Sequence, residues 1–144
     1  MQIDTKKFGT IDVKENKIIE FKHKILGFED YNKFTLIDNL DDEIFYWLQS
    51  TEEPDLSFIL LNPYEVVDDY EVQVTDDFLE DIELEDENSI IIYTMVNIGD
   101  NGEYIAINLK APILINSENQ LGGQVVLEKE YPTRHYIYKE NVNN

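Results

Sequence analysis

Apolar and polar residues alternate over short stretches along most of the chain. Because side chains two residues apart on a strand point the same way, this alternation predicts strands with one buried face. Residues 57–61 form a continuous apolar run that ends at Asn62-Pro63, which predicts a central strand buried on both faces. About ten short strands are predicted, drawn from residues 1–5, 8–13, 18–21, 34–37, 44–50, 57–61, 70–74, 89–98, 105–109, 113–116, 124–127 and 134–138.

Residues 105–116 organise this pattern, because they place two apolar strand halves on either side of a proline joint. Pro112 has no backbone N–H and pushes Ala111 toward extended geometry, which suits a bend and not a central strand. Asn108 and Asn116 stand near the ends of the two halves. We expect their amides to tie the bends to neighbouring backbone groups and so to be structural.

One short helix is predicted at residues 76–82. Thr75 can cap it, two aspartates follow where the helix dipole favours negative charge, and the apolar residues of the segment share one edge. The clearest hairpin signal is Asn101-Gly102, since both residue types tolerate positive φ in a tight turn. Residues 39–43 are predicted to form an acidic turn, and residues 51–55, with Pro54, a loop.

These elements predict a mostly β, single-domain, antiparallel β-barrel-like fold with about ten short strands and one short helix. We assign the domain to residues 1–139 and expect the polar tail at 140–144 to be disordered. Trp47, the only tryptophan, is expected to pack against the core.

Charge is distributed unevenly along the chain, whose formal net charge is −20. Residues 34–109 contain 21 Asp and Glu and no Lys or Arg, whereas the rest of the chain is nearly neutral. The negative electrostatic potential of such a segment repels nucleic acid and anionic membranes and attracts basic proteins. A solvated surface that keeps the protein soluble is the alternative reading.

Few residues suggest catalysis or a cofactor. There is no cysteine, which excludes disulfides and thiolate chemistry. His23 and His135 are far apart, and no nucleophile elbow or phosphate-binding loop occurs. The acidic clusters lack the ligand spacing of a helix–loop–helix calcium site, and no basic residues accompany the aromatic ones as a nucleic-acid footprint would need. We therefore expect a non-enzymatic binding protein without cofactor or metal.

No apolar stretch approaches the roughly 20 residues of a membrane-spanning helix, and no leader-like start is present. We therefore expect a soluble cytoplasmic protein with no membrane and no direct nucleic-acid contact, monomeric when free.

Six motifs follow one another over nearly the whole chain: Gly27-Phe28-Glu29, Trp47-Leu48-Gln49-Ser50, residues 58–63, Asn108-Leu109-Lys110-Ala111-Pro112 with Ile115-Asn116, Gln124-Val125-Val126-Leu127, and Tyr131 with Arg134-His135. In this order and spacing they resemble one family, the flagellar assembly factor FliW. The chain departs from the family at residues 22–26, where a proline- and glycine-rich approach is usual, so the conformation of this loop is open.

The resemblance implies a small non-enzymatic β protein of the bacterial cytoplasm that binds newly made flagellin or the RNA-binding translational repressor CsrA. Flagellin that accumulates occupies the factor and frees CsrA to repress flagellin mRNA, and flagellin secretion reverses this. An acidic protein without a nucleic-acid footprint fits the role, because it can regulate RNA by binding a basic RNA-binder.

Candidate contact residues follow from this implication. Loop aromatics can receive an apolar helix face of flagellin, although capping of the ends of the fold is the alternative. Rigidly presented carboxylates can attract CsrA, whereas residues 83–87 are expected to form a mobile solvated turn. The candidates are Phe28, Tyr31 and Tyr64 for flagellin, and Glu52, Glu53, Asp55, Asp68, Asp69 and Glu71 for CsrA.

Two other classes of function stay open on residue chemistry. The acidic clusters and aromatics also fit a calcium- or carbohydrate-binding β-module, which a calcium-dependent rise in melting temperature would reveal. Two of the carboxylates could act as a glycosidase pair, although no pattern selects any two of the 31 Asp and Glu.

Overall fold

The computed structural model describes residues 1–38 and 44–140. The acidic turn predicted at 39–43 and the last four residues of the predicted tail lie outside the described residues. The described residues form eleven strands and one α-helix: β1 (Gln2–Thr5), β2 (Gly9–Asp12), β3 (Ile18–His23), β4 (Lys33–Asp38), β5 (Phe45–Ser50), β6 (Ser57–Leu61), α1 (Asp76–Asp81), β7 (Ile90–Ile98), β8 (Tyr104–Ile107), β9 (Ile113–Asn116), β10 (Leu121–Gln124) and β11 (His135–Lys139).

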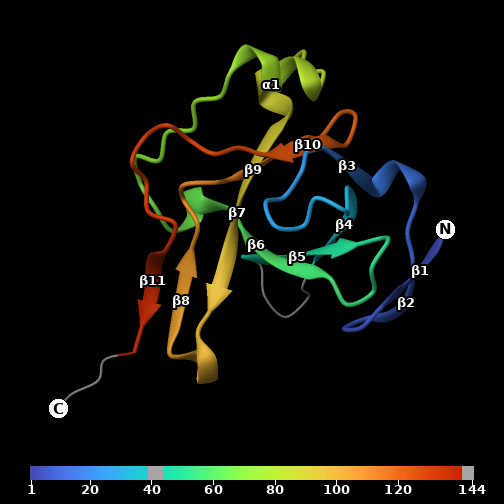
Figure 1. The fold of residues 1–144 in the computed structure, drawn as a ribbon, viewed down its shortest axis with the longest axis horizontal. Helices are drawn as coiled ribbons and strands as arrows, with labels where there is room; N and C mark the ends of the chain where they lie inside the picture. The colour runs from blue at the N-terminus through green and yellow to red at the C-terminus, as the bar shows by residue number, and fades with distance from the viewer. Residues whose placement is uncertain (39–43, 141–144) are drawn as a thin grey trace.

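Seven strands pair in a closed ring in the order β7-β6-β5-β4-β3-β10-β9, and β9 pairs back with β7 (Figure 1). β8 and β11 extend the sheet outward from β7, and β1 and β2 form a separate hairpin. The predicted mostly β, single-domain fold is confirmed, and the ring of strands stands where a barrel-like sheet was predicted. One pairing departs from the antiparallel expectation, because β10 runs parallel to β3.

The main core fills the ring, since strands from around it supply one buried cluster that includes Phe21, Phe34, Leu48 and Ile113. Successive residues of a strand point to opposite faces. Leu60 of β6 therefore joins this cluster, whereas Leu61 joins a second one on the other face of the sheet. Within the run 57–61, which was predicted to be buried on both faces, Leu60 and Leu61 are buried and the first three residues are half-buried.

A glycine pair lets β10 complete the ring between β9 and β3. A Cβ on Gly122 would stand 2.8 Å from the Leu114 carbonyl oxygen, and a Cβ on Gly123 would stand 2.8 Å from the Cβ of His23. A side chain on either residue would therefore push the neighbouring strands apart.

The bend at residues 108–112 has the structure that its sequence predicts. The side-chain oxygen of Asn108 accepts from the N–H groups of Lys110 (3.0 Å) and Ala111 (3.1 Å). Asn116 is buried, and its amide nitrogen donates to the carbonyl of Ile82 at 3.0 Å. Both amides hold bends to backbone groups, as expected, and Pro112 lies buried between them.

Two further local signals are confirmed. The Thr75 hydroxyl accepts from the N–H of Phe78 at 3.2 Å and caps α1. Asn101 and Gly102 have φ of 60° and 70° in the β7–β8 hairpin. The strand predicted at residues 70–74 is wrong, because this segment has no strand pairing, and the strand predicted at 124–127 lies earlier, as β10.

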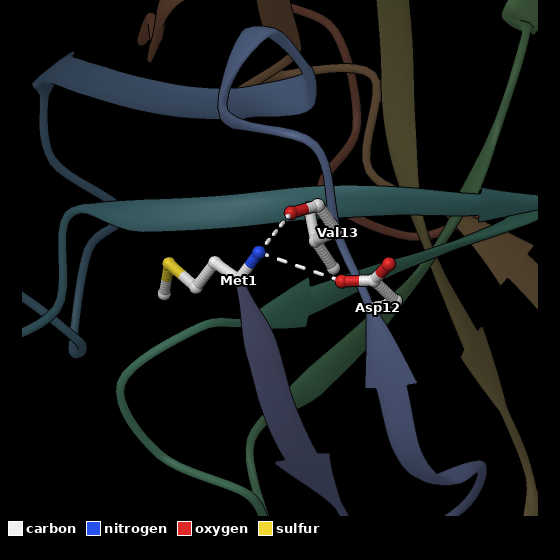
Figure 2. Close-up of polar contacts among 3 residues, drawn as sticks. All are labelled: Met1, Asp12 and Val13. Carbon is white, nitrogen blue, oxygen red and sulfur yellow. Dashed lines mark hydrogen bonds and ion pairs between the residues drawn. The ribbon is translucent and has the colours of Figure 1, made fainter.

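The N-terminal hairpin packs against the outside of the ring. Figure 2 shows the N-terminal ammonium of Met1 bound to the carboxylate of Asp12 and the carbonyl of Val13, at 3.4 and 3.2 Å. The turn between β1 and β2 covers Trp47: the Lys7 ammonium lies 3.7 Å from the centre of an indole ring. Trp47 is half-buried here and belongs to none of the buried clusters, so its predicted place in the core is wrong.

Candidate partner-binding surfaces

The loop after β5 is held together by the side chains of the last two residues of that strand. Buried Gln49 donates from its amide to the carbonyls of Ser50 and Leu56, both at 3.1 Å. The Ser50 hydroxyl accepts from the N–H groups of the next acidic pair at 3.0 and 2.9 Å. This network makes the loop rigid, as its proline predicts, and it explains why Gln49 and Ser50 stand in the motif that begins at Trp47.

The three carboxylates of this loop have different surroundings. Glu52 accepts from the N–H groups of Asn32 and Lys33, both at 3.1 Å, so its carboxylate binds the start of β4. Glu53 is half-buried. Asp55 is exposed, and its carboxylate has no partner within the described residues. The carboxylate of Glu53 also has no partner among the described residues, so Asp55 differs from it in being exposed rather than half-buried.

The second acidic group divides in the same way. Glu71 lies 3.4 Å from the ammonium of Lys129, so its charge is compensated. Asp68 and Asp69 are exposed and have no side-chain partner in the described part of the chain. Asp69 has φ of 58°, a conformation that Asp tolerates better than most residues. The pair precedes an irregular segment and not the strand that the sequence predicted.

Phe28 and Tyr31 lie at one end of the ring, and both contact its core. The Phe28 ring is 5.0 Å from that of Phe58 in an edge-to-face arrangement, although 38% of the residue stays exposed. Tyr31 is half-buried against the same core. Both therefore cap the end of the ring, and only Phe28 offers a sizeable exposed apolar surface.

The turn that carries Phe28 owes its shape to its neighbours. Gly27 has φ of 88°, where a side chain would be strained, and its N–H donates to the Glu29 carboxylate at 3.1 Å. This hydrogen bond lowers the pKa of Glu29. The Gly27-Phe28-Glu29 motif is thus a turn that displays one aromatic ring.

Tyr64 belongs to a different surface from Phe28 and Tyr31. Its ring lies 5.9 Å from Tyr70, and Tyr70 lies 4.9 Å from Tyr131. Burial raises the pKa of Tyr64, and its neighbour Tyr131 adds to the shift, yet half of the residue is exposed. Sequence reasoning missed Tyr70 and Tyr131, because their separation along the chain gives no sign that their rings meet.

Two concave surfaces lie on the described part of the chain. The first, about 410 Å³, is a groove between residues 71–75 and 124–129, with Phe78 and His23 beside it. The second, about 390 Å³, is a shallow hollow beside Trp47 and Ile59. Neither contains a constellation of nucleophile, base and orienting group that would suggest catalysis. We call the first of these the 71–75/124–129 groove.

No three His, Asp or Glu residues within 1–38 and 44–140 converge as metal ligands. Within the same ranges, no helix has the length and apolar character to cross a membrane.

Comparison with known proteins decides the family. The FliW protein family model matches residues 2–137. The chain belongs to the FliW family. It is 37% identical to the flagellar assembly factor FliW of Alkaliphilus metalliredigens (strain QYMF) over 97% of this chain and 88% of that protein.

Other relatives agree over the full length. The flagellar assembly factor FliW of Thermoanaerobacter pseudethanolicus (strain ATCC 33223 / 39E) is 38% identical over 99% of this chain and 97% of that protein. A crystal structure of the flagellar assembly factor FliW superposes with a TM-score of 0.89 at 34% identity, covering 99% of this chain and all of the other. The described fold is therefore the FliW fold, and the family is one of flagellar assembly factors.

Proposed function

We propose that this FliW protein is a non-enzymatic cytoplasmic factor that binds newly made flagellin and, when flagellin is scarce, binds the RNA-binding repressor CsrA. Accumulated flagellin occupies the factor and frees CsrA to repress flagellin mRNA. Secretion of flagellin empties the factor again, so CsrA is recaptured. Flagellin synthesis is thereby coupled to flagellin secretion.

The observation that carries this proposal is the match to flagellar assembly factors over residues 2–137, joined to the charge of the chain. Residues 34–109 have no cation, so an approaching basic protein meets a field of one sign. Asp55, Asp68 and Asp69 add exposed carboxylates that no described side chain neutralises. These features favour capture of a basic RNA-binder and oppose binding of RNA itself.

Flagellin needs a different kind of surface. An amphipathic helix docks through apolar residues spaced along one face, which require exposed apolar side chains on the receptor. Phe28 and Tyr64 are 38% and 50% exposed, and they lie in different clusters of the fold. We propose flagellin contact at these aromatics and at Tyr31, whose N–H donates to the Phe28 carbonyl at 3.1 Å, and CsrA contact at the carboxylates.

A three-component titration tests the proposal. CsrA is first bound to a fluorescent RNA that contains the flagellin ribosome-binding region, and this protein is then added. Fluorescence anisotropy should fall as CsrA leaves the RNA, and it should recover when monomeric flagellin is added in excess. The protein mixed with the RNA alone should leave the anisotropy unchanged, since its charge opposes RNA binding.

Each stage of the titration can contradict the proposal. If the anisotropy of the CsrA–RNA complex did not change at micromolar concentrations of this protein, the proposed antagonism of CsrA would be contradicted. A fall that flagellin does not reverse would separate the two partners and exclude a switch between them.

A further inference from the structure

A side-chain contact marks each end of the 71–75/124–129 groove. At one end the Lys129 ammonium lies 3.4 Å from the Glu71 carboxylate. At the other end the Phe78 ring lies 4.7 Å from the His23 ring, whose Nε2 is 2.7 Å from the Asp81 carboxylate. Residue 71 is therefore opposite residue 129. Phe78 lies beside Gly123 of β10, where an added Cβ would stand 2.9 Å from the Phe78 ring, so the two walls run in opposite directions.

One wall has the backbone of an unpaired sheet edge. Beyond β10, the N–H of Val125 donates to the Pro112 carbonyl (3.0 Å) and that of Leu127 donates to the Lys110 carbonyl (2.8 Å). In a ladder of this kind, alternate residues turn their N–H and C=O groups to the opposite edge. The backbone groups of Val126 and Glu128 therefore face away from 110–112, and no described residue pairs with them.

The other wall is also unpaired. The N–H and C=O groups of residues 72–74 make no hydrogen bond to any described residue, and no backbone bond joins the two walls. Their side chains nevertheless alternate between half-buried Val72 and Val74 and exposed Gln73, which is the burial pattern of an extended segment. Two extended segments thus stand beside the groove without forming a ladder across it.

The groove has apolar walls and acidic surroundings. Val126 is 55% exposed, and Val74 and Val125 are half-buried beside it. In the groove, the Lys129 ammonium and the His23 imidazole each face a carboxylate. Exposed carboxylates without a described side-chain partner remain at Glu128 on one wall and at Asp76 and Asp77 just beyond the other.

We propose that the 71–75/124–129 groove binds an extended segment of a basic partner protein as an added β-strand along residues 125–128. Unpaired backbone groups supply hydrogen bonds to such a strand, and the valines receive its alternate apolar side chains. Glu128, Asp76 and Asp77 attract Lys or Arg residues at the ends of the segment. This inference does not depend on flagellin or CsrA, and its test uses neither.

The probe is a fluorescent, terminally blocked peptide that alternates valine and threonine and has lysine at both ends. We expect saturable binding in a fluorescence anisotropy titration. A twin peptide with methylated nitrogens at its central residues keeps the side chains but loses the N–H donors, and it should bind at least tenfold more weakly. A twin with glutamate in place of lysine should also lose at least tenfold.

Matched protein variants locate the binding. Val126→Arg places a long cation in the groove and should weaken lysine-peptide binding at least tenfold. Val66→Arg makes the same change at another exposed valine, which lies outside the groove, and should leave binding unchanged. Both positions are exposed, so thermal unfolding should show that both variants fold. Amide hydrogen exchange adds a readout without mutation: the peptide should slow exchange at Val126 and Glu128.

Several results would overturn the proposal. Equal binding of the methylated twin would show that backbone pairing is not used. Equal losses in the two arginine variants, or slowed exchange only outside the two walls, would put the peptide elsewhere. If the lysine peptide did not bind, or if it bound as a helix, an added strand would be excluded.

Discussion

The hydroxyl of Tyr70 donates a hydrogen bond to the backbone carbonyl of Leu109 at 2.7 Å. Tyr70 is buried, and it stands between the rings of Tyr64 and Tyr131. The bond joins the irregular segment after residue 67 to the bend that links β8 to β9. It therefore holds one wall of the groove to the sheet.

Removing this hydroxyl should destabilise the fold. Tyr70→Phe keeps the ring but leaves the Leu109 carbonyl buried without its partner, so we expect a loss of about 1–3 kcal/mol in the free energy of unfolding. Urea denaturation measures the loss. Tyr138→Phe is the matched control, since that residue is 49% exposed and should change little. Equal effects of the two substitutions would contradict the structural role of the bond.

Asn108→Ala should also lower stability, by about 1–3 kcal/mol, because two backbone N–H groups lose their acceptor. Pro112→Ala should cost less, mainly through the greater freedom of the unfolded chain. The denaturation midpoints of the two variants provide the comparison. If Asn108→Ala kept its midpoint and lost partner binding, Asn108 would be a contact residue instead.

Gln49 allows a test with two substitutions. Its amide nitrogen points at the carbonyls of Ser50 and Leu56, with those of Glu53 and Pro54 within 3.4 Å. Gln49→Leu should cost about 1–3 kcal/mol, because these carbonyls lose a buried donor. Gln49→Glu should cost more at neutral pH, since it places a buried negative charge against carbonyl oxygens.

The glutamate variant should regain stability in acid. The surrounding carbonyls raise the pKa of the introduced carboxyl, so the folded state holds a proton that the unfolded chain releases above about pH 4.3. Its stability therefore falls as pH rises through that range. Urea denaturation across pH, with Gln49→Leu as the reference, measures the difference. Parallel pH profiles for the two variants would contradict the placement of the carbonyls.

Alkaline pH should lower the free energy of unfolding, partly because Tyr93 ionises. Burial raises the pKa of Tyr93 to about 12, with Tyr46 and Asp38 adding to the shift. The unfolded chain releases this proton at about pH 10. The contribution of Tyr93 is therefore fully present below about pH 10 and is lost as pH rises toward 12, by about 2–3 kcal/mol in all.

Tyr93→Phe removes this dependence and should flatten the fall of unfolding free energy between about pH 10 and 12. Tyr138→Phe again serves as the exposed control. Burial also raises the pKa of Tyr70, so part of the alkaline fall in unfolding free energy should persist in both variants. An unchanged slope in Tyr93→Phe would mean that other groups cause the alkaline transition.

The acidic candidates can be compared through matched neutralisations. Asp68→Asn with Asp69→Asn keeps the left-handed backbone at residue 69 acceptable. Glu85→Gln with Glu87→Gln removes the same charge from the turn before β7. The first pair should slow CsrA association more than the second, and the wild-type rate should fall with salt. Stopped-flow mixing across a salt series measures both. Equal slowing by the two pairs, or a salt-independent rate, would place the contact elsewhere.

Local signals in the sequence predicted local structure well. The Thr75 cap, the Asn101-Gly102 turn and the Asn108 bend depend on groups a few residues apart, so the residue types alone indicate them. The alternation at residues 70–74 correctly predicts which side chains face inward. It does not predict pairing, because the neighbouring segment stays across the groove.

Other features depend on contacts that the sequence does not mark. Trp47 and Leu48 lie on opposite faces of β5, and both faces of that strand are covered, so alternation cannot tell which residue enters the ring. Glu71 and Lys129, or Glu52 and Asn32, meet only in the folded chain. Which carboxylates keep a free charge was therefore not predictable from their clustering.

The parallel pairing of β3 with β10 has a consequence for synthesis on the ribosome. β3 lies at residues 18–23, and its partner at 121–124 emerges only after strands β4 to β9 have been synthesised. Until then the nascent chain exposes the edge of β3 and the apolar side chains that the ring later encloses. Contacts between such distant segments form slowly. The interval before closure is therefore when this chain is most vulnerable to aggregation and most dependent on its own strong negative charge to stay dispersed.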